Sequence, residues 1–329
     1  MENSGIKINK KIKMDLKKIK IIFFGTPNFS DTILKILIKE KIKPSLIVTS
    51  PDKPIGRKQI ITPPPVKKTA KENKIKFFQP ENEKAIEEKI KELNPDLIIT
   101  AATGIILSKE ILKTPKYGCL NIHPSLLPKY RGPSPIQAAI LNGDKKTGVS
   151  IIKMTEGIDE GPILASSSFI IENIKISYED LEKELAKMSG KLIKDTIPKW
   201  INGEIEPEEQ DDSKATYTRK IKKEDGKIDW DNSAEEIERK IRAFNSWPSA
   251  FCIAENKVMK ILEASVLEQT KNGPSKEPGK VYLAANDQIA VQCGKDYLIV
   301  EELQFSGKNK LKVEDFLKGN IDFIGITLK

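Results

Sequence analysis

The sequence predicts an α/β fold, in which a doubly wound, Rossmann-like domain precedes a β-rich domain. Short apolar runs, typical of strands buried on both faces, alternate with longer amphipathic segments typical of helices. After residue 250, short apolar segments are instead separated by Gly, Pro, Asn and Asp, a pattern that favours a small barrel or sandwich. A length of 329 residues suffices for two domains, each with its own core.

Composition narrows the class of protein. The net charge is +9, and residues 1–80 carry 19 Lys and Arg against 6 Asp and Glu. This surplus fits a phosphate-bearing partner, and it fits a merely lysine-rich chain equally well. No apolar run approaches the ~20 residues of a membrane span, so we expect no membrane association. Three scattered cysteines and a single histidine argue against disulfides and metal sites, and predict a cytoplasmic protein without a bound metal.

The chain begins with a lysine-rich segment, residues 1–18, that lacks the apolar core of a secretory signal. We expect it to be a disordered extension, with Met14 as an alternative start. Ile19–Phe24 then predicts the first buried strand, followed by a helix with Thr26 as N-cap. The single glycine of this turn is not a dinucleotide fingerprint, which disfavours a nicotinamide dehydrogenase.

Further elements follow in order. The proline-rich and basic residues 50–68 predict a long irregular loop, because proline interrupts both helix and strand. Beyond it, apolar periodicity predicts helices at Glu81–Leu93 and Tyr178–Ile201, and strands at Asp96–Ala101, Tyr117–Ile122, Gly148–Lys153 and Ile163–Ile171.

Composition also predicts the domain boundaries. The acidic residues 203–213 have few apolar side chains and suit a linker. We therefore expect a catalytic domain at residues 19–204, a linker at 205–224 and a C-terminal domain at 225–329. Within the last, Ser233 and Glu236 form a capping box that predicts a helix start, and Trp247 is expected to pack in a core or interface.

One stretch carries the candidate chemistry. Asn121 and His123 alternate with two apolar residues, so they share one face of a strand. Prolines then end the strand, and ligands of open α/β sheets bind at such strand ends. Asp159 lies on a glycine-flanked turn between two apolar runs, from which a carboxylate can reach a strand-end site. Taken alone, an Asn-x-His pair is also compatible with a structural histidine.

These motifs resemble the signature of the folate-dependent formyltransferases. The resemblance rests on Asn121-Ile-His-Pro-Ser-Leu-Leu-Pro128, Arg131-Gly-Pro-Ser-Pro-Ile-Gln137 and Asp159-Glu-Gly161, with support from Phe23–Pro27, Ser50–Arg57 and Ile241–Pro248. It runs from about Ile19 to the C-terminus. Within the family, the chain is most similar to members whose acceptor is the α-amine of methionine on initiator tRNA.

The resemblance implies a reaction and a set of roles. The formyl group of 10-formyltetrahydrofolate would pass to initiator methionyl-tRNA, in a monomeric enzyme with an OB-like C-terminal domain that binds tRNA. The implied catalytic residues are Asn121, His123 and Asp159. The implied folate-binding residues are Ser125, Leu126, Leu127 and Pro128, and the implied tRNA-binding residues are Lys53, Arg57 and Lys58.

Other functions stay open on the sequence alone. A formyltransferase acting on glycinamide ribonucleotide would resemble only the first ~200 residues, whereas one acting on an amino-sugar nucleotide would keep a similar C-terminal domain. A nonenzymatic RNA-binding protein with a degenerate α/β domain is disfavoured by the intact Asn121, His123 and Asp159. Arg131 has two interpretations, either as the partner of a carboxylate or phosphate or as a solvent-facing side chain.

Overall fold

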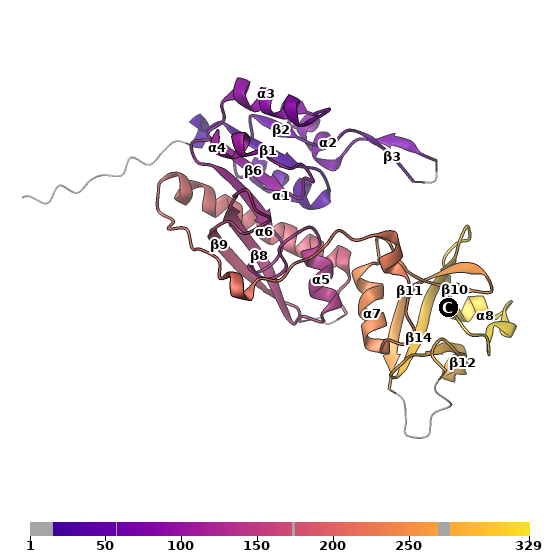
Figure 1. Ribbon diagram of the computed structural model, residues 1–329. Helices are drawn as coiled ribbons and strands as arrows, with labels where there is room; N and C mark the ends of the chain where they lie inside the picture. Colours follow the sequence, from indigo (N-terminus) through magenta and orange to yellow (C-terminus); the bar gives the residue numbers. More distant parts are fainter. Residues whose placement is uncertain (1–15, 57, 173–174, 269–276) are drawn as a thin grey trace, which may run out of the picture. The chain divides into compact units, whose positions relative to one another are not determined.

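The computed structural model describes residues 16–56, 58–172, 175–268 and 277–329, and it divides into two compact units (Figure 1). Unit 1 comprises Met1–Arg131, Gly148–Ser168 and Lys183–Thr216, and unit 2 comprises Gly132–Thr147, Phe169–Glu182 and Tyr217–Lys329. Most of the predicted N-terminal extension lies outside the described residues, and Leu16–Lys18 forms a 3-10 helix. The domain boundaries predicted from composition stay a prediction.

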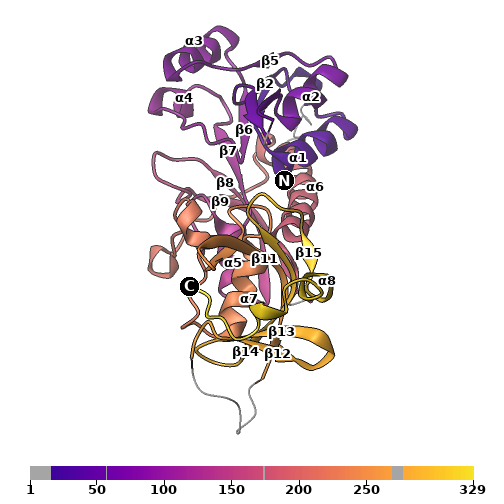
Figure 2. The ribbon, with the colours of Figure 1, turned by 90° about the vertical axis from the view of Figure 1, so that its right-hand side faces the viewer.

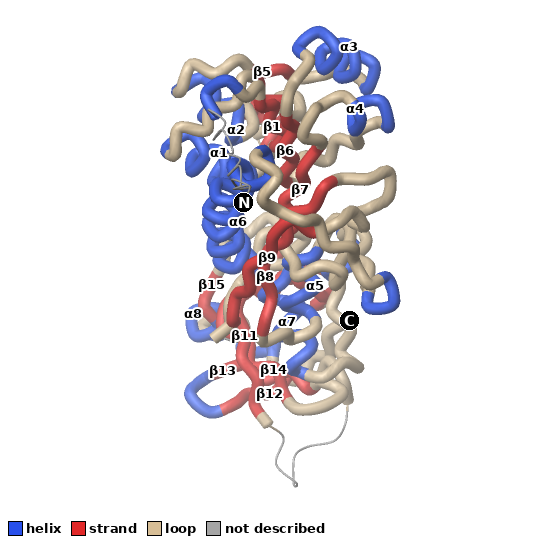
Figure 3. The backbone as a smooth tube through the Cα atoms, turned by 90° about the vertical axis from the view of Figure 1, so that its left-hand side faces the viewer, coloured by secondary structure: helices blue, strands red, loops and turns tan. Residues whose placement is uncertain are grey.

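A seven-stranded sheet, in the order β5-β2-β1-β6-β7-β8-β9, organises the first part of the chain. The first five of these strands run parallel, and β8 pairs antiparallel with β7. Figures 2 and 3 label the strands of this sheet. The strands are β1 (Ile21–Gly25), β2 (Leu46–Val48), β5 (Phe77–Phe78), β6 (Leu97–Ala101), β7 (Cys119–His123), β8 (Lys146–Lys153) and β9 (Ile163–Ile170). This arrangement confirms the predicted Rossmann-like fold.

Helices cover the sheet because its central strands are apolar on both faces. Every residue of β1 and β6 is buried. Ile22 and Phe24 of β1 pack in one cluster with Ile86 and Ile90 of α3. The helices of this part are α1 (Asn28–Lys39), α2 (Pro65–Glu72), α3 (Glu83–Leu93), α4 (Lys109–Lys113), α5 (Pro135–Leu141) and α6 (Tyr178–Ile201).

Two local predictions were wrong. Residues 50–68 are not irregular, because β3 (Lys53–Ile55) and β4 (Ile60–Thr62) form an antiparallel hairpin and α2 begins at Pro65. Proline is tolerated in an edge strand and in the first turn of a helix, so these prolines do not exclude regular structure. Helix α1 has Pro27 as N-cap without a side-chain cap, since the Thr26 hydroxyl instead lies 3.2 Å from that of Ser50.

Unit 2 contains an antiparallel sheet of six strands, as the C-terminal pattern predicted. They are β10 (Ala250–Ala254), β11 (Lys257–Leu267), β12 (Val281–Ala284), β13 (Gln288–Gln292), β14 (Tyr297–Phe305) and β15 (Leu311–Lys312). Helix α7 (Ala234–Ala243) begins with the predicted Ser233–Glu236 capping box, and α8 (Val313–Leu317) follows β15. Short 3-10 helices lie at Asp212–Lys214, Lys223–Gly226, Ala285–Asp287 and Ile321–Phe323.

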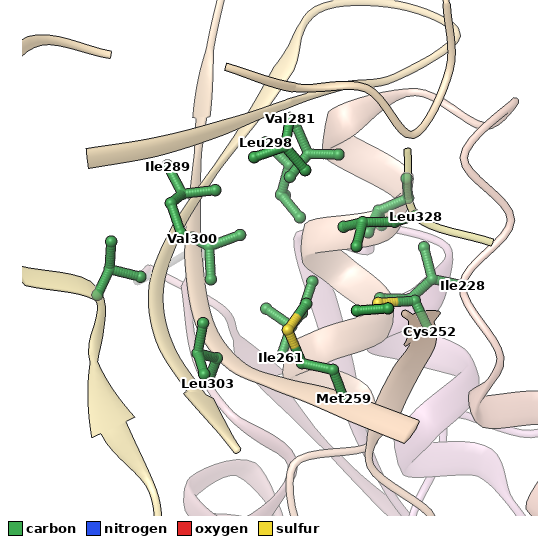
Figure 4. Close-up of a cluster of buried hydrophobic side chains, with 14 of the residues drawn as sticks. Ile228, Cys252, Met259, Ile261, Val281, Ile289, Leu298, Val300, Leu303 and Leu328 are labelled. Atoms are coloured by element: carbon green, nitrogen blue, oxygen red, sulfur yellow. The ribbon is translucent and has the colours of Figure 1, made fainter. Parts of the chain in front are cut away.

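The core of unit 2 forms between this sheet and α7. Residues of β11, β13 and β14 point toward one another, among them Met259, Ile289 and Leu298 (Figure 4). They form one buried cluster with Ile237 and Ile241 of the helix. Trp247, expected in a core or interface, is 53% exposed and is therefore not part of a core. Among the described residues, no helix combines the length and apolar character needed to cross a membrane.

Candidate active site

The end of β7 presents two polar side chains in an otherwise buried strand. Asn121 is half-buried and His123 is buried, and both lie in register with β8, opposite Ile152 and Ser150. The strand ends here because Pro124 follows at once. Both predicted residues therefore lie at the carboxyl end of a central strand, as the alternation of apolar and polar residues indicated.

Asp159 reaches these side chains from the loop between β8 and β9. Asn121 Nδ2 donates a hydrogen bond of 2.9 Å to Asp159 Oδ1, and the other carboxylate oxygen lies 3.5 Å from His123 Nδ1. The side chains of His123 and Asp159 are 5% and 14% exposed. The structure thus brings together the three residues predicted to be catalytic, and their burial strengthens the electrostatic interactions between them.

The hydrogen bonds of His123 define its tautomer. Its Nε2 lies 2.8 Å from the carbonyl oxygen of Tyr130. A carbonyl oxygen only accepts, so Nε2 must carry a hydrogen. The other ring nitrogen, Nδ1, lies 3.5 Å from the carboxylate oxygen Oδ2 of Asp159.

Thr100 orients the amide of Asn121 and was missed by sequence reasoning. This residue lies at the end of β6, directly beside Asn121 in the parallel pair, and is 2% exposed. Its hydroxyl donates to Asn121 Oδ1 at 2.8 Å. Because the oxygen of the amide is held by Thr100, the nitrogen faces Asp159, and this bond uses one of the two amide hydrogens. Its position at a strand end was the only signal in the sequence.

The segment Ser125–Pro128 follows the histidine directly, and its own contacts are structural. The Ser125 hydroxyl donates to the carbonyl of Lys129 at 2.6 Å, and the backbone N–H of Leu127 donates to Ser150 Oγ at 3.0 Å. Leu127 is buried and Leu126 is partly exposed. These contacts fix the shape of the loop, and the predicted folate contacts of the four residues stay a prediction.

Two of the basic residues predicted to bind tRNA lie on the β3–β4 hairpin, Lys53 in β3 and Lys58 in the turn before β4. Lys53 and Lys58 are exposed, and Arg57 lies outside the described residues. At the base of the hairpin, hydrogen bonds from Lys67 and then Gln79 lower the pKa of Asp52. The hairpin therefore has a fixed base and presents its lysines to solvent.

Arg131 has a partner, which decides between its two interpretations. Its side chain is 1% exposed, and Nη2 lies 2.6 Å from Asp212 Oδ1. It is therefore the partner of a carboxylate. Across the described residues, no group of three His, Cys, Asp or Glu side chains is arranged to hold a metal ion.

Comparison with known proteins identifies the family. A model described as formyl transferase matches residues 17–197, and one described as formyl transferase, C-terminal domain, matches residues 220–320. The chain belongs to the formyl transferase family. It is 43% identical over 314 residues to the methionyl-tRNA formyltransferase of Clostridium novyi (strain NT), covering 94% of this chain and 100% of that relative.

Two solved structures of this family's fold are also similar. The methionyl-tRNA formyltransferase from Clostridium thermocellum is 26% identical, with a TM-score of 0.51 over 78% of this chain and 95% of that one. An N-formyltransferase from Helicobacter canadensis, in complex with folinic acid and dTDP-3-aminofucose, has a TM-score of 0.64 at 23% identity, over 86% of this chain and 98% of that one. The second likeness shows the fold alone.

Proposed function

We propose that this chain transfers the formyl group of 10-formyltetrahydrofolate to the α-amine of methionyl-initiator tRNA, for use in translation initiation. The observation that carries the proposal is the extent of the match. Identity of 43% covers the whole of a methionyl-tRNA formyltransferase, the C-terminal domain included. A monomeric enzyme acting in the cytoplasm is part of the same proposal.

The site geometry supports acyl transfer. The amine nitrogen attacks the formyl carbon and forms a C–N bond, while the carbonyl electron pair moves onto oxygen. The second N–H of Asn121 would donate to this oxyanion, a kind of interaction whose loss typically lowers the rate by ~10²–10³. When the oxyanion collapses, the bond from carbon to N10 of the folate breaks.

His123 and Asp159 account for the protons. The attacking amine loses one proton and N10 of the leaving tetrahydrofolate gains one, so the transfer is balanced. With Nε2–H held by Tyr130, Nδ1 of His123 is the ring atom that exchanges this proton. The nearby carboxylate of Asp159 stabilises the charged imidazole while it holds the proton.

Binding of the two substrates is proposed for separate segments. Ser125, Leu126, Leu127 and Pro128 would line the folate site beside His123. The hydroxyl of Thr103, near the end of β6, is buried without a hydrogen-bond partner among the described residues, which fits a polar substrate group there. Lys53, Arg57 and Lys58 would contact tRNA phosphates, because their hairpin is exposed and basic.

The deciding experiment measures formylation of three acceptors by the purified chain with 10-formyltetrahydrofolate. We expect transfer to charged initiator tRNA, and transfer only to glycinamide ribonucleotide or to an amino-sugar nucleotide would overturn the proposal. In the His123→Ala variant, turnover should fall sharply while tRNA binding persists. Full activity in that variant would refute the assigned chemistry.

A second experiment tests the tRNA hairpin. Replacing Lys53 and Lys58 by Gln should weaken tRNA binding and reduce the slope of log K against log salt by about two. Lys84→Gln is the matched control, since it removes one charge from an 85% exposed side chain on α3. Equal effects of the double variant and the control would exclude a specific role for the hairpin.

A further inference from the structure

The segment Glu208–Thr216, here called the strap, is bonded to both loops of the candidate active site. At one end, Glu208 and Ile163 exchange backbone hydrogen bonds of 2.7 and 2.9 Å just beyond the Asp159 loop. At the other end, the backbone oxygen of Thr216 accepts from Arg131 N at 2.8 Å, and its hydroxyl accepts from Tyr130 N at 2.8 Å. The carbonyl of the same Tyr130 holds His123.

Gln210, in the middle of the strap, holds the backbone that carries Asp159. Its Nε2 donates to the carbonyl oxygens of Asp159 at 2.8 Å and of Gly161 at 2.7 Å. Both amide hydrogens are therefore used to fix one short turn. Asp159 has a φ of +53°, in the left-handed region that residues with a Cβ adopt at some cost, and the two hydrogen bonds stabilise the backbone in this conformation.

Arg131 determines which way the Gln210 amide points. The guanidinium donates to Gln210 Oε1 from Nε at 3.1 Å and from Nη2 at 3.0 Å. A guanidinium only donates and the two carbonyls only accept, so the amide has a single orientation that satisfies all four contacts. Arg131 is buried and also paired with Asp212, which keeps the planar group in place.

We propose that Gln210 is a positioning residue for the catalytic carboxylate, and that Arg131 acts through Gln210. The chain of contacts runs from Arg131 through Gln210 to the Asp159 backbone, and from the Asp159 carboxylate to Asn121 and His123. The inference deepens the proposed function and rests on it for the identity of the reaction. A displacement of about 1 Å in such a group costs about 10²-fold in rate.

The test is Gln210→Glu, which keeps the shape of the side chain. The glutamate still accepts from Arg131, but it can no longer donate to the two carbonyls, so the turn is released while the ion pair preserves the fold. We expect kcat to fall about 10- to 100-fold. The KM values for tRNA and folate should stay within about twofold, because neither substrate is proposed to touch Gln210.

A matched control is available in the preceding residue. Glu209 is exposed, and Glu209→Gln makes the reverse chemical change one position away. Glu209→Gln should leave kcat unchanged. The double variant with Gln210→Glu restores the net charge and should be as slow as Gln210→Glu alone. Recovery in the double variant would show a charge effect and overturn the proposal.

A spectroscopic measurement separates this inference from the proposed function. The chain contains one histidine, so in tag-free protein the 15N ring signals report His123 alone. Gln210→Glu should move these signals without any substrate present, whichever acceptor the enzyme uses, and Arg131→Lys should move them less. Unchanged ring signals together with kcat within threefold of the parent would overturn the positioning role. If Gln210→Glu does not fold, the same signals in Gln210→Met decide the question.

Discussion

The amide of Asn121 allows a sharp test of the candidate chemistry through the isosteric variant Asn121→Asp. In the parent, one N–H binds Asp159 across 2.9 Å, and we propose that the other donates to the substrate oxygen. The variant puts two carboxylates at this separation. With an effective dielectric constant of about 20, two unit charges there repel by roughly 6 kcal/mol, so the pair retains one proton near neutral pH.

That proton lies between the two carboxylates, so no hydrogen is left for the oxyanion. Loss of one such donor corresponds to ~10²–10³ in kcat, or about 2.7–4 kcal/mol of transition-state stabilisation. The loss should persist throughout the pH range in which the pair holds one proton, because the single O–H is shared between the two carboxylates. Binding of tRNA should be unaffected.

Single-turnover formylation with saturating substrates measures this effect directly. The matched control is Asn82→Asp, which makes the same change at the exposed N-cap of α3, where the side chain only accepts a hydrogen bond from Ala85 N. The control should retain the parental rate. A rate within threefold of the parent in Asn121→Asp would refute the role of the amide as a donor.

Three further predictions follow from other contacts. Thr100→Val should lower kcat about fivefold, because it removes one hydrogen bond worth ~1 kcal/mol, and Thr100→Ser should retain activity. Equal rates for the two variants would exclude a role of Thr100 in orienting Asn121. Hydrogen bonds from Arg219 lower the pKa of Asp225 from 3.8 to about 2. The stability that this pair contributes is therefore present above about pH 4 and is lost as the pH falls toward 2. The difference in unfolding temperature between the parent and Asp225→Asn should therefore shrink across that interval, and a constant difference would contradict the linkage. Burial raises the pKa of all three cysteine thiols to about 12. A thiol reagent at about pH 8 should therefore label the chain only after denaturation, and labelling of the native chain would contradict this burial.

Much of the fold was predictable because its local patterns agree with its tertiary environment. The apolar run at β1 indicates a strand that is buried along its whole length. The alternation of Asn121 and His123 with apolar residues indicates that these two side chains share one face of β7. The capping box at Ser233 marks a helix start through contacts made within four residues. The β3–β4 hairpin was missed because its prolines lie where no ladder hydrogen bond is needed, which only the pairing reveals.

The candidate site was predictable only where one residue stood out. His123 is the sole histidine, and Asp159 lies between glycines. Thr100 and Gln210 are ordinary residues whose roles depend on contacts far along the chain. Thr100 reaches Asn121 through the register of two parallel strands, and Gln210 lies 79 residues after Arg131. Neither the contact between Thr100 and Asn121 nor that between Gln210 and Arg131 produces a periodic pattern in the sequence.

The strap also bears on how the enzyme is made. Ribosomes deliver a chain from its N-terminus, so β7 and the Asp159 turn are synthesised well before Gln210 and Thr216. A nascent chain that ends before the strap has every proposed catalytic side chain but lacks the bonds that hold the aspartate turn against the histidine loop. The site is therefore completed late in synthesis, after nearly all of the first sheet and α6 have left the ribosome.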